Sequence, residues 1–165
     1  MSVTNDIARS YTRPRQVLRR RIAGGVREDR ALAILMAGCL VMFVAQWPGL
    51  SRAAFEDPSI PLEARLGGAL MGWLFIAPLA LYILAALTQL VARVFGSTAT
   101  GYATRMALFW AVLAASPLWL LSGLVAGFIG PGIAFNLTGL VAGVAFLGIW
   151  TAGLWEVQSR NGTGA

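Results

Sequence analysis

The chain has 165 residues, of which 58% are hydrophobic and only 12% are charged, and its net charge is +6. A typical soluble domain is roughly 25% charged, and a soluble fold of this length could not enclose so much apolar surface. The composition therefore excludes a soluble globular protein. It predicts an all-α membrane protein, because a helix satisfies its own backbone hydrogen bonds in lipid.

Residues 1–30 form a polar arm that carries eight of the 13 basic residues, all of them Arg. Pro14 suits the first turn of a helix and Gly24-Gly25 suits its end, so the arm is expected to contain an interfacial helix. Two interpretations of its charges stay open. Either they contact anionic lipid headgroups or a partner, at about 1 kcal/mol each, or they only set the orientation of a disordered arm. The arginines concerned are Arg13, Arg15, Arg19, Arg20 and Arg21.

Three uncharged runs follow, at 31–50, 66–92 and 106–155. A bilayer core of about 30 Å needs about 20 helical residues, so each of the first two runs predicts one span. The third is too long for one crossing and is expected to fold back at the Gly-Pro-rich segment 127–132. We therefore predict a transmembrane domain over 31–155 with four spans and a short cytoplasmic tail over 156–165. The spans are expected at about 31–50, 66–92, 106–127 and 133–155.

Arg placement predicts the orientation, because cytoplasmic segments carry an excess of basic residues. The arm and the 93–105 loop carry an excess of basic residues. The 51–65 loop has more acidic than basic residues, and the hairpin is uncharged. This pattern favours both chain ends in the cytoplasm of a bacterial inner membrane. Five tryptophans near the expected span ends fit an interfacial aromatic belt, whereas Trp119 lies mid-span. Kinks are expected at Pro78 and Pro117.

Small residues four apart recur in the spans, as in Gly68/Gly72. In lipid, helices associate where small side chains let the backbones approach each other. We expect the third and fourth spans to pack across their hairpin through Gly123 and Gly127 on one helix and Gly139 and Gly143 on the other.

Reactive side chains are scarce. The sequence has no His, no Lys and one cysteine, Cys39, and no carboxylate falls within an expected span. Ser116 would need a general base to act as a nucleophile, and the acidic residues of the 51–65 loop match no cation-binding pattern. Cys39 ends a sequence close to a lipoprotein cleavage box, but the polar segment before it is too long for a signal peptide. We therefore expect no catalytic residue, no cofactor, no metal and an unmodified Cys39.

The stretch from Tyr11 to Arg20 and the ladder of apolar spans with the turn Phe128-Ile-Gly-Pro131-Gly132 resemble the Yip (Ypt/Rab-interacting protein) domain family, in particular its small bacterial members. The resemblance implies a small helical membrane protein of trafficking or interaction type without catalytic residues. The family usually has five spans, whereas four are counted here. Its acidic Leu-Gly-Pro motif does not occur before the first expected span.

The leading functional hypothesis is a non-enzymatic scaffold or accessory protein that packs against other membrane proteins or against itself. The alternative is a small oligomeric channel or transporter for a neutral solute, built around Gln46, Thr88 and Gln89. A membrane enzyme is the third possibility and has the least support. We expect lipid as a partner and no nucleic acid, because apart from Tyr11 no aromatic residue interleaves the arginines.

Overall fold

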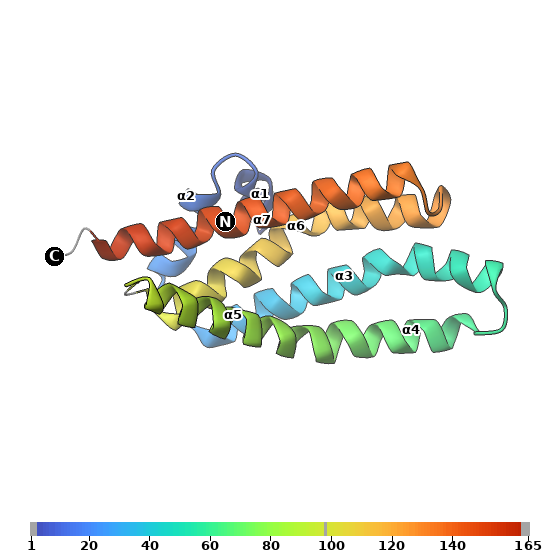
Figure 1. Cartoon of the computed structure of the whole chain (residues 1–165), viewed down its shortest axis with the longest axis horizontal. Helices are drawn as coiled ribbons and strands as arrows, with labels where there is room; N and C mark the ends of the chain where they lie inside the picture. The colour runs from blue at the N-terminus through green and yellow to red at the C-terminus, as the bar shows by residue number, and fades with distance from the viewer. Residues whose placement is uncertain (1–2, 98, 163–165) are drawn as a thin grey trace.

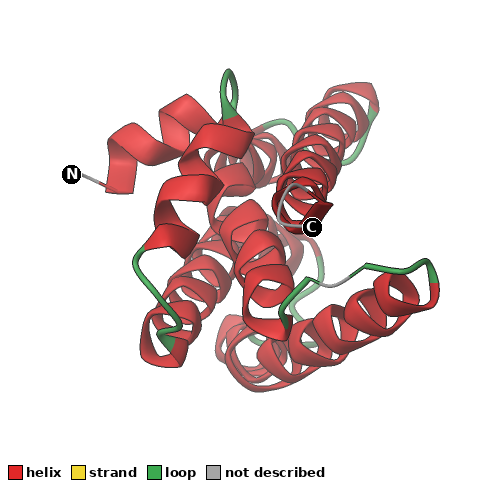
Figure 2. Ribbon diagram, turned by 90° about the vertical axis from the view of Figure 1, so that its left-hand side faces the viewer, coloured by secondary structure: helices red, strands yellow, loops and turns green. Residues whose placement is uncertain are grey.

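The computed structural model describes residues 3–97 and 99–162, and these residues form helices and loops with no strand. Two short helices come first in the described chain, and four long helical segments follow, arranged as Figures 1 and 2 show. The second long segment consists of α4, the π-helical turn η1 and α5. The elements in chain order are α1 Val3–Ser10, α2 Pro14–Ala23, α3 Glu28–Glu56, α4 Leu62–Met71, η1 Gly72–Ile76, α5 Ala77–Val94, α6 Gly101–Phe128 and α7 Ile133–Gly162.

Four helical segments of the described chain are long and apolar enough to cross a membrane, which confirms the predicted all-α membrane fold. They run over 28–56, 62–94, 101–128 and 133–159. Each segment is longer than the span expected from the sequence, and only the start at residue 133 is unchanged. The extensions contain charges that suit helix ends, since Glu28 and Asp29 lie in the first turn of α3. The N-in, C-in orientation stays a prediction.

Prolines modify two of these segments. Pro78 has no N–H to donate and its ring crowds the carbonyl four residues earlier. The wider π-helical turn η1 lies just before it and relieves that crowding. Pro117 lies inside α6, and Figure 1 shows α6 changing direction between its yellow first half and its orange second half.

The predicted hairpin between the third and fourth spans is confirmed. The helix α6 ends at Phe128 and α7 begins at Ile133. Gly130 has a φ of 93°, which a side chain would disfavour, and its amide donates to the Val125 carbonyl at 3.0 Å. The turn therefore ends α6 abruptly, so α7 returns alongside α6 (Figure 1).

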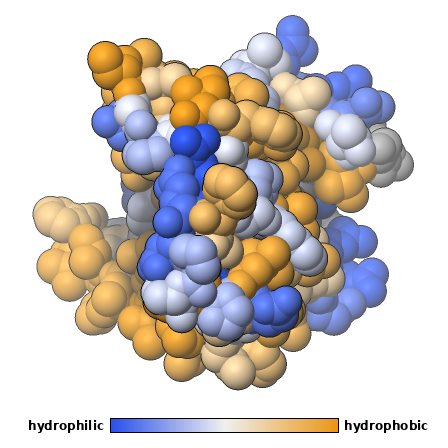
Figure 3. All heavy atoms as spheres, turned by 90° about the vertical axis from the view of Figure 1, so that its right-hand side faces the viewer, coloured by the Kyte–Doolittle hydropathy of each residue, from blue (hydrophilic) through white to orange (hydrophobic). Residues whose placement is uncertain are grey.

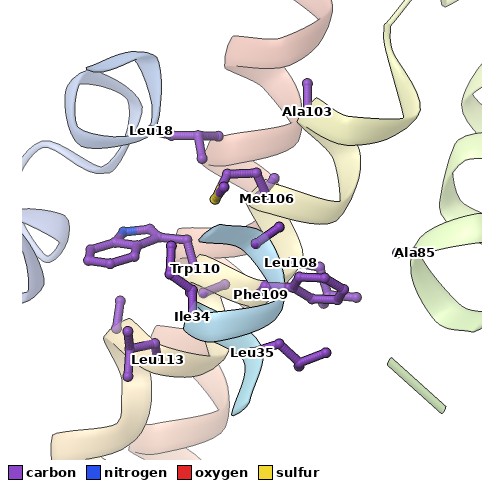
Figure 4. Close-up of a cluster of buried hydrophobic side chains, with 14 of the residues drawn as sticks. Leu18, Ile34, Leu35, Ala85, Ala103, Met106, Leu108, Phe109, Trp110 and Leu113 are labelled. Carbon is purple, nitrogen blue, oxygen red and sulfur yellow. The ribbon is translucent and has the colours of Figure 1, made fainter. Parts of the chain in front are cut away.

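The first half of α6 is the centre of the molecule. Every residue from Tyr102 to Ser116 except Arg105 is buried. In Figure 4, Trp110 points toward the arm and Phe109 points toward α5. The ring of Phe109 meets Tyr82 of α5 edge-on, at 4.9 Å between centroids. The arm, α3, α5 and α7 therefore surround this half of α6 and form the core with it.

The opposite end of the bundle carries the α3–α4 loop and the 129–132 turn. Figure 3 shows a narrow hydrophilic band across this end, flanked by hydrophobic surface. Asp57 accepts hydrogen bonds from the amide and the hydroxyl of Ser59, at 3.1 and 2.6 Å, and pairs with Arg65 at 3.1 Å. The Ser59 hydrogen bonds hold the pKa of Asp57 below its ordinary value. The loop is thus held by its own side chains.

Candidate functional site

Within the polar segment 1–30, the helices α1 and α2 and their connecting turn, residues 3–23, form a folded arm that polar contacts hold against α6 and α7. The helix α2 begins at Pro14 and ends before Gly24, as the sequence predicts, so its helical state is confirmed. Its residues Val17 and Leu18 are buried, and a Cβ placed on Gly153 of α7 would lie 3.1 Å from Leu18. The helix α1 was not predicted. The arm is therefore a folded part of the bundle, and it lies against α6 and α7.

A network that we call the arm dock joins α1, α2 and α6. The Trp110 indole donates to the Ser10 hydroxyl at 2.9 Å, and that hydroxyl donates to the Asp6 carbonyl at 2.7 Å. The Arg21 guanidinium pairs with the Asp6 carboxylate at 2.7 Å and lies 3.6 Å from the centroid of the Trp110 ring. Burial lowers the pKa of Arg21 from its ordinary value, while Asp6 acts in the opposite direction.

The dock continues to the proline in α6. Because Pro117 lacks an N–H, the carbonyl of Leu113 loses its helical partner. The Ser116 hydroxyl donates to that carbonyl at 2.7 Å, and the Tyr11 hydroxyl donates to the neighbouring Ala114 carbonyl at 2.8 Å. Burial raises the pKa of Tyr11. Ser116 and the arm thus satisfy carbonyls at the bend, and the Ser116 hydroxyl is engaged in its own helix.

The five arginines assigned to lipid or partner contact divide into two groups. Arg21 points inward in the dock, Arg19 pairs with Glu156 of α7 at 3.1 Å, and Arg15 lies 5.3 Å from the centroid of the Trp155 ring. Arg13 and Arg20 are exposed. Three of the five therefore act within the protein, and contact with anionic lipid stays a prediction.

The prediction that the α6 glycines pack against the α7 glycines is wrong, because the α6 glycines contact α3. A Cβ on Gly123 would lie 1.7 Å from the Ala45 carbonyl oxygen of α3, and one on Gly127 would lie 2.4 Å from Pro48. On α7, a Cβ on Gly139 would meet only the Ser122 hydroxyl, at 3.8 Å, and Gly143 has nothing within 4 Å. The glycines of α6 serve the crossing with α3, because that is where the two backbones meet.

Two of the three side chains that favoured a channel are engaged. The Gln89 amide donates to the Ala99 carbonyl at 2.6 Å and accepts from the Thr104 hydroxyl. Thr88 donates to the Leu84 carbonyl of its own helix at 2.8 Å. Gln46 is exposed on α3. Gln46 and Gln89 line two different hollows of the described structure.

The acidic and cysteine side chains of the described residues are dispersed, paired or buried. Residues 3–97 and 99–162 contain no cluster of three His, Cys, Asp or Glu side chains able to hold a metal ion. Glu56 pairs with Arg52 at 2.7 Å. Cys39 is fully buried in α3.

Trp110, which the sequence places in the aromatic belt, is only 1% exposed because the arm covers it.

Comparison with known proteins identifies no relative, so any functional assignment rests on the contacts described above. No family model matches the chain, and no curated protein or solved structure matches it either. The resemblance to the Yip domain family therefore stays a prediction.

Proposed function

We propose that this protein is a non-enzymatic, multi-pass membrane accessory protein that packs against another membrane protein through the face of α4, η1 and α5. One observation carries the proposal. The segment 62–94 is only 6% buried over its most apolar window, and Gly67, Gly68 and Gly72 have nothing within 4 Å of an added Cβ.

Membrane helices associate through close backbone approach, since lipid supplies no hydrophobic force between them. Gly68 and Gly72 stand one helical turn apart, and the exposed side chains of Phe75 and Leu79 continue the face. The π-helical turn η1 contains Gly72 and Phe75, and such turns occur frequently at functional sites. Together these residues offer a flat segment flanked by large apolar side chains to a partner helix.

A Gly68→Leu variant tests the proposal, because the open surroundings allow the side chain without a clash inside the protein. Crosslinking in native membranes followed by mass spectrometry is expected to recover one recurrent unlike membrane protein from wild type. That partner should be lost or strongly reduced with Gly68→Leu. The matched control is Gly148→Leu on α7, which is equally open and should keep the partner. Self-association alone, accompanied by solute flux in liposomes, would favour the channel instead.

The proposed location is a bacterial inner membrane with the arm and the end of α7 in the cytoplasm. The Arg19–Glu156 pair supports placing both at one end of the bundle, and the eight arginines of residues 1–30 favour the cytoplasmic side. Reporter fusions after Asp57 and Ser97 are expected to read periplasmic and cytoplasmic, respectively. The opposite readings would reverse the orientation.

A further inference from the structure

A cavity of about 420 Å³ lies between α3, η1, α6 and α7, on the far side of Pro117 from the arm. Its walls are almost wholly apolar and include two indole rings. This volume falls within the roughly 300–1,000 Å³ typical of small-molecule sites. The side chains that shape it are Met42, Gln46, Trp73, Trp119, Ser122 and Phe135. Trp119, which does not fit an aromatic belt, therefore has a place as a cavity wall.

Two polar side chains in this wall lack partners. Among the residues that the structure describes, neither the Gln46 amide nor the Ser122 hydroxyl makes a hydrogen bond, although Ser122 is only 3% exposed. A polar group at membrane depth without a partner is costly, because hydrocarbon cannot replace water as a partner. Both groups therefore favour an occupant that is mostly apolar and carries a hydrogen-bonding oxygen.

The depth of Gln46 indicates which oxygen. It lies four residues before Leu50, the end of the first uncharged run, or about 6 Å at 1.5 Å per residue. That position is near the boundary of the hydrocarbon layer, where the ester carbonyls of phospholipids reside. Met42 lies one further turn toward the middle of the membrane, so the cavity continues along the direction of an acyl chain.

We propose that this cavity binds one acyl chain of a membrane phospholipid, with the Gln46 amide donating to its ester carbonyl. Trp73 and Trp119 pack against the chain. The close crossing of α3 and α6 at Gly123 bounds the cavity, because Ala45 and Gly123 both line it and leave no large side chain there. The cavity includes Trp73 of η1, but none of the residues that form the proposed partner face, Gly68, Gly72, Phe75 and Leu79, lines it.

Native mass spectrometry of the full chain, released from membranes and delipidated stepwise in detergent, tests the site. Wild type is expected to retain one phospholipid after the bulk lipid is gone. Met42→Trp places an indole in the cavity and should reduce retention at least about tenfold, which corresponds to about 1.4 kcal/mol. The matched control is Val44→Trp, an exposed position on the same helix outside the cavity, and it should retain the lipid.

Gln46→Leu keeps the shape of the wall and removes the amide. It should reduce retention about three- to tenfold, the contribution of one hydrogen bond. Its control is Thr88→Val, whose hydroxyl bonds only within its own helix. Equal retention in Met42→Trp and Val44→Trp would overturn the site. Retention of a free fatty acid or a prenyl lipid in place of a phospholipid would overturn the occupant, and unchanged retention in Gln46→Leu would overturn the role of the amide.

Discussion

The two halves of α6 have similar hydrophobicity and opposite surroundings. Before Pro117, the helix is enclosed on all sides by the arm, α3, α5 and α7, and Tyr102–Ser116 is buried almost without interruption. From Pro117 to Phe128, only Ser122 is buried, and Leu121 and Leu124 are each nearly half exposed. Apolar character therefore predicts membrane depth but does not distinguish protein contact from lipid contact. The many alanines of the first half admit five neighbouring helices, whereas the second half meets α3 closely at Gly123 and Gly127.

The largest expected effect comes from the α3–α6 crossing in the exposed half. Gly123→Leu should cost more than about 4 kcal/mol of folding stability, because the Cβ alone would overlap the Ala45 carbonyl. Thermal unfolding in lipid nanodiscs measures the loss. Gly143→Leu, which has open space around it, is the control and should stay near wild type. Equal stabilities of the two variants would show that α3 and α6 do not cross at Gly123.

The next effect compares two tryptophans of the same helix. Trp110→Ala should cost about 3–5 kcal/mol, since it empties a fully buried site and removes the partner of Ser10. Trp119→Ala should cost less than half as much, because it only widens a cavity that lipid can fill. Denaturation of both variants in one detergent provides the measurement. Similar losses would mean that the two halves of α6 are packed equally.

Arg21→Gln should destabilise the arm by about 2–3 kcal/mol. This is below the roughly 3–5 kcal/mol of a fully buried pair, because 14% of Arg21 and 15% of Asp6 remain exposed. Hydrogen exchange should increase in α1 and α2 and change little in the second half of α6. Arg20→Gln removes an exposed charge of the same helix and should leave the exchange unchanged. If the two substitutions had equal effects, the stability of the arm would depend on its total charge and not on the pair between Arg21 and Asp6.

The smallest effect concerns one hydroxyl at the bend. Tyr11→Phe should cost about 1 kcal/mol, because it leaves the Ala114 carbonyl without the hydrogen bond that the arm donates. Tyr102→Phe is a sharp control, since the buried Tyr102 hydroxyl has no partner within the described structure and its removal should cost nothing. Both variants lose one phenolic oxygen, but only Tyr11→Phe loses a hydrogen bond. The difference between their thermal midpoints therefore measures the contribution of that bond. A Tyr102→Phe variant that is the less stable of the two would contradict the assignment.

Sequence patterns were sufficient for the four long helical segments, the Gly-Pro hairpin and the helix that begins at Pro14, because each depends on local composition. They were insufficient for the contacts between segments. Gly123 and Gly127 have the right spacing for packing, but spacing does not tell which helix they face. Trp110 has the signature of an interfacial residue, and only the fold of α1 reveals that it is covered. Asp6 lies in α1 and Arg21 lies in α2, 15 residues apart, so their pairing had no local signal.

The contact between Tyr11 and Ala114 also constrains the order in which the parts of the protein can fold. Synthesis proceeds from the N-terminal end, so the arm leaves the ribosome long before Trp110 and Ala114 exist to receive it. During that interval Val17 and Leu18 lack the surfaces that later bury them, since α6 and α7 follow much later in the chain. The arm is thus translated before the helices that bury it, and it is among the last described parts of the chain to reach its final place.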